Sequence, residues 1–197
     1  GYGHGLAMAG RCAVAGGAAW LCVADAAEAG RLRRDGYPGN LFVLYPVPPG
    51  IASKMASLAV DVTVGNKREA RDIADHLAPD GPTLGVHLEI ETGMTRGGLS
   101  PEDALDAATA IDEGRTTTLA GVWTHLAAPE NTPATDQQLT LLDSVVDRIT
   151  RAGIDPGSVH ALASGGMLAG VVEGHALVRL GLALYGLHPG AGRPLPR

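Results

Sequence analysis

Residues 84–98 read LGVHLEIETGMTRGG, and the beginning of this stretch decides what kind of sheet the chain forms. His87, Glu89 and Glu91 alternate with apolar residues, so the three ionisable side chains share one face of a strand. A covering layer of helices requires an apolar face, and the polar face must therefore point away from it. We interpret the stretch as a strand whose polar face lines the interior of a barrel. Ionisable groups are stable there when they are paired, and Arg96 is the expected partner of Glu89.

The rest of the chain repeats short apolar runs that are separated by longer amphipathic stretches. Strands are expected at Trp20–Ala24, Leu41–Tyr45, Ala59–Val64, Leu84–Glu91, Leu119–His125, Val159–Ser164 and Leu177–Gly186. Helices are expected at residues 5–17, 26–35, 51–58, 67–77, 101–113, 134–152 and 166–173. Regular alternation of strands and helices is typical of a parallel α/β fold.

Two parallel architectures fit this alternation, a closed barrel and an open doubly wound sheet. An open sheet of the dinucleotide-binding kind carries a GxGxxG turn after its first strand, and that motif is absent. We therefore predict a TIM-type (β/α)8 barrel that is truncated at its first strand. The barrel domain is expected to span residues 1–189. The Gly- and Pro-rich residues 190–197 are expected to begin a linker to a further domain.

Composition narrows the classes of partner. The formal net charge of -6 argues against nucleic acid, which requires a basic surface. No apolar run reaches the roughly 18 residues of a membrane span, and no signal peptide is visible. Cys12 and Cys22 match no metal or redox spacing, and we expect core thiols in a reducing compartment. No HxH or HExxH spacing occurs, so a metal site is not expected.

Polar residues recur where the predicted strands end, which is where barrels of this kind carry their chemistry. His125 ends one strand, and Ser164, before two glycines, is expected to cap a helix or to bind an anion. Arg179 interrupts an apolar run, on the same face as Gly181 and Tyr185. A buried guanidinium requires acceptors or an anion around it. These features favour an interior site for a phosphorylated aromatic cofactor.

Five motifs resemble, in order and spacing, those of the alanine racemase family. They are GYGHG (1–5), HLEIETGMTRGG (87–98), WTHLAAPE (123–130), HALASGG (160–166) and VRLGLALYGLHP (178–189). Members of this family are fold-type-III enzymes that depend on pyridoxal 5′-phosphate (PLP) and combine an N-terminal barrel with a C-terminal β-domain. The resemblance implies interconversion of L- and D-alanine, which supplies D-alanine for peptidoglycan, by a cytoplasmic homodimer.

The resemblance also implies roles for individual residues. Arg179 would face the pyridine nitrogen of PLP and keep it unprotonated. Arg96 would reach the phenolic oxygen, and His125 would lie against the ring; both would support catalysis. The residues expected around the phosphate are Tyr2, Ser164, Gly181 and Leu182, and Tyr185 is also expected to bind the cofactor.

Two departures from the family pattern stand out. The family's Schiff-base lysine lies four residues before the tyrosine of YGHG, and its second base is a tyrosine of the partner subunit's C-terminal domain. Both fall outside these 197 residues, and neither Lys54 nor Lys67 is an obvious substitute, so we expect this chain alone to be an inactive piece of a longer protein. Glu89 stands where many members have a carbamylated lysine, and we expect its negative charge to hold Arg96.

Other interpretations remain open from the sequence. A different fold-type-III PLP enzyme, either a broad amino-acid racemase or a lyase resembling D-threonine aldolase, would share this barrel. A non-catalytic PLP-binding protein of the cofactor-homeostasis kind would also share it, as would a barrel without any cofactor.

Overall fold

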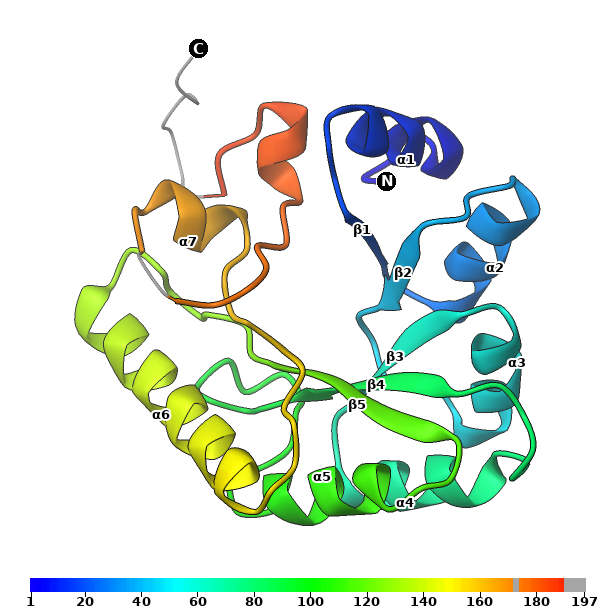
Figure 1. Ribbon diagram of the computed structural model, residues 1–197. Coiled ribbons are helices and arrows are strands. Elements are labelled where there is room, and N and C mark those ends of the chain that lie inside the picture. Colours follow the sequence, from blue (N-terminus) through cyan, green and yellow to red (C-terminus); the bar gives the residue numbers. More distant parts are fainter. Residues whose placement is uncertain (172–173, 190–197) are drawn as a thin grey trace.

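A computed structural model describes residues 1–171 and 174–189 of the chain. Its centre is a six-stranded parallel sheet in which the strands follow one another in sequence order. The strands are β1 (Trp20–Val23), β2 (Asn40–Val43), β3 (Val60–Val64), β4 (Leu84–Glu89), β5 (Thr117–Trp123) and β6 (Ser158–His160). The sheet curls into part of a barrel with helices outside it (Figure 1). The predicted truncated α/β barrel is confirmed.

The helices follow the predicted order, and several of them are shorter than predicted. They are α1 (Leu6–Ala15), α2 (Ala26–Arg34), α3 (Ala52–Ser57), α4 (Lys67–His76), α5 (Ala104–Asp112), α6 (Thr132–Arg151) and α7 (Ser164–Leu168), with two 3-10 helices, η1 (Pro49–Ile51) and η2 (Leu182–Tyr185). Asp25 caps α2 by accepting hydrogen bonds from the N–H groups of Ala27 and Glu28. The expected helix start at Pro101 is wrong, because Ser100 caps a separate turn there and α5 begins only at Ala104.

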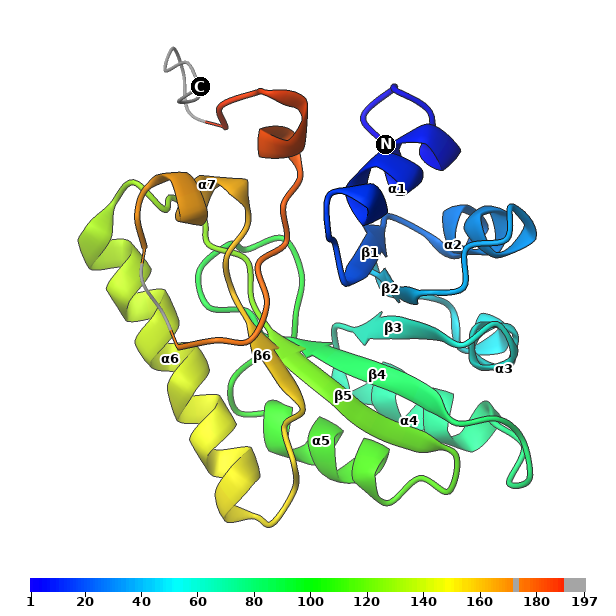
Figure 2. The same ribbon diagram turned by 45° about the horizontal axis from the view of Figure 1, so that its top comes forward.

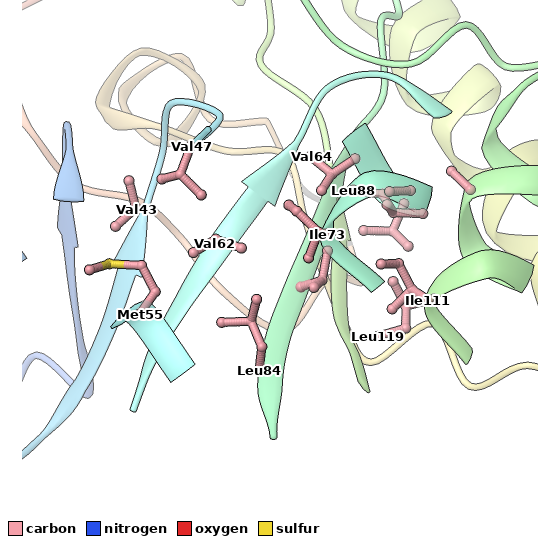
Figure 3. Packing of buried hydrophobic residues seen from close by; sticks show 14 of the residues in the cluster. Val43, Val47, Met55, Val62, Val64, Ile73, Leu84, Leu88, Ile111 and Leu119 are labelled. Atoms are coloured by element: carbon pink, nitrogen blue, oxygen red, sulfur yellow. The ribbon is translucent and has the colours of Figure 1, made fainter. Parts of the chain in front are cut away.

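The hydrophobic core lies between the curled sheet and the outer helices. Figure 3 shows Val62, Leu84 and Leu88 of the strands packed toward Ile73 of α4 and Ile111 of α5. All five side chains are fully buried. Removing this apolar surface from water is the main stabilising contribution that joins each helix to the sheet.

The opposite face of the sheet carries aromatic and polar residues. The ring centroids of Phe42 and His87 lie 4.2 Å apart, and the rings of Trp123 and His160 stack at 5.9 Å. His87 is 1% exposed and Glu89 is 8% exposed. The prediction that the polar face of this strand points into the barrel interior is therefore confirmed for His87 and Glu89, while Glu91 lies beyond the end of β4.

The predicted last strand, Leu177–Gly186, is wrong. Its only pairing among the described residues is a single bridge between Ala163 and Arg179, and the chain then turns into η2. The N–H of Gly181 donates to the Ser164 hydroxyl instead of to a strand neighbour, so the ladder cannot continue. The turn brings Tyr185 against the N-terminal segment, 5.3 Å from the ring of Tyr2 (Figure 2).

The structure also corrects the expectations for the two cysteines and for the helix over residues 166–173. Cys12 and Cys22 are exposed and are not core thiols: Cys12 lies on α1, and Cys22 lies on the edge strand β1, where it faces the cavity. The predicted helix over 166–173 is shorter, since α7 ends at Leu168, and its residues 172–173 lie outside the described residues. The predicted linker over residues 190–197 lies outside them as well.

Gly121 provides a test of how closely the barrel interior is packed. A β-carbon on Gly121 would lie 2.3 Å from Nδ1 of His87 and 2.6 Å from the carbonyl oxygen of Ser158. We expect Gly121→Ala to lower the free energy of unfolding by about 1–3 kcal/mol, the usual cost of overpacking, as measured by urea denaturation. Gly50→Ala is the control, because a β-carbon there meets no atom within 4 Å. Equal unfolding free energies for the two variants would contradict the packing argument.

Candidate active site

A cavity of about 1300 Å³ opens at the carboxyl ends of the strands. The fold brings most of the predicted site residues to its wall: Tyr2, Arg96, His125, Ser164, Arg179, Gly181 and Leu182. Tyr185 and Glu89 do not line the cavity themselves. Tyr185 contacts Tyr2, and Glu89 pairs with Arg96. Positions separated by more than 170 residues in the sequence therefore meet in one concave site, where ligands of parallel barrels bind.

Arg179 is surrounded by acceptors. Its Nη2 donates to the carbonyl oxygens of Thr124 at 2.7 Å and Ala161 at 3.2 Å, and its Nη1 donates to that of His160 at 3.2 Å. The guanidinium carbon lies 4.6 Å from the ring centroid of Trp123, at cation–π distance. A guanidinium has donors and no acceptor, and these contacts satisfy it inside the barrel.

Two histidines contact this cation and are held neutral. Nδ1 of His125 lies 3.5 Å from Nη2 of Arg179, and burial, together with Arg179 and then Arg96, lowers the pKa of His125 to about 4. Nδ1 of His160 contacts Nη1 of Arg179, and burial with the same cation lowers the pKa of His160 to about 2. A neutral imidazole nitrogen can accept from a guanidinium, and an imidazolium cannot. Arg179 is therefore flanked by two uncharged rings.

Ser164 joins the last two segments of the described chain. Its buried hydroxyl accepts from the N–H of Gly181 at 2.9 Å and of Ala183 at 3.2 Å. The expectation that Ser164 caps a helix is wrong: Ala163 is the cap of α7, without a side-chain hydrogen bond. The N–H of Leu182 lies at the start of η2, where it has no partner within the helix.

Gly181 allows a close approach at this point. A β-carbon on Gly181 would lie 2.4 Å from the hydroxyl oxygen of Tyr2. Tyr2, Ser164, Gly181 and Leu182 therefore meet at one part of the cavity wall. Hydroxyl and backbone N–H donors gathered in a concave site are suited to bind an anion.

Arg96 and Glu89 form the ion pair that the sequence predicts. Nη2 of Arg96 lies 3.8 Å from Oε1 of Glu89, and the Arg96 guanidinium also approaches the ring of Tyr45 at 5.9 Å. Burial raises the pKa of Glu89, while Arg96 and then Arg179 partly counter that effect. The carboxylate thus tethers a half-exposed cation at the rim of the cavity.

Sequence reasoning missed Gln138, which organises the loops around the cavity. This buried α6 residue accepts from the N–H of Ala127 at 3.0 Å and donates to Oγ1 of Thr92 at 3.0 Å and to the carbonyl of His125 at 3.3 Å. It ties the loops after β4 and β5 together. A glutamine on an amphipathic helix carries no sequence signal for such a role.

Neither lysine of the chain reaches the cavity. Lys67 begins α4, as its sequence setting suggests, and its Nζ pairs with Oδ1 of Asp103 at 2.6 Å. Lys54 lies on α3, away from the cavity wall. Over residues 1–171 and 174–189, no cluster of three or more metal-binding side chains is found, and no helix is long and apolar enough to cross a membrane.

Comparison with known proteins identifies the family. The family model "Alanine racemase, N-terminal domain" matches residues 1–189. The chain is 34% identical over 203 residues to an alanine racemase of Thermobifida fusca, with 100% of this chain and 54% of the relative aligned.

Two solved structures extend the comparison. Alanine racemase from Bacillus anthracis with bound L-Ala-P has a TM-score of 0.87 at 28% identity, over 96% of this chain and 50% of that one. A histidine racemase from Leuconostoc mesenteroides has a TM-score of 0.83 at 28% identity, over 94% of this chain and 50% of that one. The chain spans about half the length of the relatives it matches. It belongs to the alanine racemase family and corresponds to the family's N-terminal domain.

Proposed function

We propose that residues 1–189 are the PLP-binding barrel domain of an alanine racemase, which interconverts L- and D-alanine. The observation that carries the proposal is Arg179, a satisfied cation at the cavity wall that is flanked by neutral His125 and His160. The family match over the same residues supports it. Residues 190–197 would begin the linker to a C-terminal β-domain.

The cavity fits PLP on chemical grounds. We call Tyr2, Ser164, Gly181 and Leu182 the phosphate cradle. It offers the hydroxyl protons of Tyr2 and Ser164 and the N–H of Leu182, and the absent side chain of Gly181 leaves space for the Tyr2 hydroxyl beside the backbone. Arg179 places a permanent positive charge at the cavity wall, and His125 offers an uncharged ring surface. PLP carries a phosphate, a pyridine nitrogen and a planar ring. These three groups match the phosphate cradle, the charge of Arg179 and the ring of His125, respectively.

Each of these residues has a distinct task in the proposed reaction. When bound, PLP supplies the electron sink that makes the α-proton of an amino acid removable. Arg179 would face the ring nitrogen, and its permanent positive charge would disfavour a proton on that atom. This moderates the electron sink and favours racemisation over side reactions. His125 would lie against the ring without adding a second positive charge, and Arg96 would reach the phenolic oxygen.

The Glu89–Arg96 pair replaces the carbamylated lysine that resemblance to the family leads one to expect. In the proposed site, Glu89 holds Arg96 at the cavity rim through the 3.8 Å contact. The carboxylate is encoded directly and needs no modification. Its burial has a cost in stability, which is the usual consequence of placing a charge inside a protein for a positioning role.

A racemase of another amino acid is the second candidate. The likeness to a histidine racemase, at a TM-score of 0.83, favours this possibility over a lyase resembling D-threonine aldolase or a non-catalytic PLP-binding protein. Racemisation assays of a longer protein that contains this chain, with alanine and histidine as substrates, separate the two candidates. The supply of D-alanine for peptidoglycan, a homodimer and a cytoplasmic location are further parts of the proposal, supported by resemblance to the family.

The phosphate cradle leads to a test with two ligands. We expect Ser164→Ala to weaken PLP binding about tenfold, the loss of one hydrogen bond to a charged group, and to leave binding of pyridoxal unchanged. Fluorescence titration of the 197-residue chain measures both affinities. Ser144→Ala on the exposed side of α6 is the control. An equal loss for pyridoxal and PLP would show that Ser164 does not contact the phosphate.

The position of the two lysines leads to a second test of the same complex. We expect PLP to bind this chain reversibly and without racemisation of L-alanine, because Lys54 and Lys67 lie away from the cavity wall. Borohydride reduction followed by peptide mapping should find no stoichiometric adduct on either lysine. Turnover of L-alanine, or such an adduct, would require a different catalytic lysine.

The raised pKa of Glu89 predicts how the stability of the domain depends on pH. Because burial raises its pKa above the ordinary value of 4.5, the native state loses stability as the pH rises through that raised pKa. We expect Glu89→Gln to remove this loss, so that the variant gains melting temperature relative to wild type at neutral pH and not below pH 4.5. Glu102→Gln, at an exposed position, should follow wild type at every pH. A lower melting temperature of Glu89→Gln at neutral pH would mean that attraction to Arg96 outweighs desolvation.

A further inference from the structure

A chain of side chains runs through the barrel interior behind Arg179. Oδ2 of Asp61 lies 3.3 Å from Nε2 of His87, and Nδ1 of His87 lies 3.4 Å from Nε2 of His160. Nδ1 of His160 then contacts Nη1 of Arg179. We call these four residues the interior chain. It joins Asp61, near the start of β3, to the cation at the carboxyl ends of the strands.

Only one arrangement of protons satisfies all three contacts. Arg179 can only donate, so Nδ1 of His160 must accept, and a neutral His160 then carries its proton on Nε2. That proton points to His87, so Nδ1 of His87 must also accept, which leaves the proton of His87 on Nε2. This last proton meets the Asp61 carboxylate. Every hydrogen bond therefore runs in one direction, from the guanidinium to the carboxylate.

The surrounding residues hold the two imidazoles in place. His87 and His160 are each 1% exposed, and Phe42 and Trp123 pack on their rings. Two glycines leave the space that the interior chain occupies. A β-carbon on Gly85 would lie 2.2 Å from Oδ1 of Asp61, and the corresponding clash at Gly121 is with Nδ1 of His87.

We infer that Asp61 is a positioning residue, which acts through His87 and His160 to orient the guanidinium of Arg179 toward the cavity. The inference rests on the proposed function because Arg179 is assigned there to the ring nitrogen of PLP. The carboxylate polarises both imidazoles and makes Nδ1 of His160 a better acceptor. Nη1 of Arg179 is thus held by the imidazole and the carbonyl oxygen of His160. Nη2 is held by the carbonyl oxygens of Thr124 and Ala161.

The protons of the interior chain can be observed directly. We propose long-range ¹H–¹⁵N correlation spectra of the 197-residue chain, with labelled histidine, at neutral pH and without PLP. In wild type, Nε2 is expected to be protonated and Nδ1 unprotonated in both His87 and His160, with ring protons protected from exchange. Asp61→Ala should shift the His87 Nε2 proton and, through the interior chain, that of His160.

Two further variants make the test specific. Asp61→Asn retains an oxygen acceptor, so the protonation pattern and the coupled His160 signal should be restored, with a smaller shift because the charge is gone. Asp80→Ala removes an exposed carboxylate before β4 and should change neither ring. A proton on Nδ1 of His87 in wild type, or an unshifted His160 in Asp61→Ala, would overturn the inference. Because the spectra need no cofactor, a failure to bind PLP would contradict the proposed function alone.

Discussion

The guanidinium of Arg179 requires several acceptors at once, and the arrangement of the strand ends supplies them. Its partners are main-chain carbonyls that follow β5 and β6, together with the Trp123 ring and the His160 imidazole. Leaving such a donor unpaired away from water would be costly, so the two strand ends must converge on it. The cavity, the neutral histidines and the position of the last segment all depend on this convergence.

Burial and that one cation together set the electrostatics of the interior. Burial is the larger cause of the lowered pKa values of His125 and His160, and Arg179 adds to it, so both rings can accept or pack without repelling the guanidinium. Arg179 also lowers the pKa of Glu89 against the larger opposite effect of burial. The site thus combines a permanent positive charge, uncharged imidazoles and a carboxylate whose burial is only partly compensated by Arg96 and Arg179.

The two faces of the curled sheet serve different purposes. The helix-facing side is aliphatic and fully buried, as at Val62 and Leu84, and it stabilises the domain without chemical demands. The interior side mixes rings, charges and glycines, and its packing allows few substitutions because Gly85 and Gly121 leave no space for a methyl group. The helix-facing side of the sheet therefore stabilises the domain, and the interior side positions the polar and charged side chains.

The sequence by itself determined the parallel α/β barrel, because periodicity and strand–helix alternation are local properties. It also determined the Glu89–Arg96 pair, since both residues lie on one short stretch that ends at the barrel mouth. Only the tertiary structure decided that Leu177–Gly186 is not a strand, because an apolar run shows the same pattern whether or not a neighbour pairs with it. The Ser164 contacts, the loop-joining role of Gln138 and the line from Asp61 to Arg179 were likewise decided there. They join residues far apart in the sequence, and hydrogen bonds depend on where the folded backbone places their atoms.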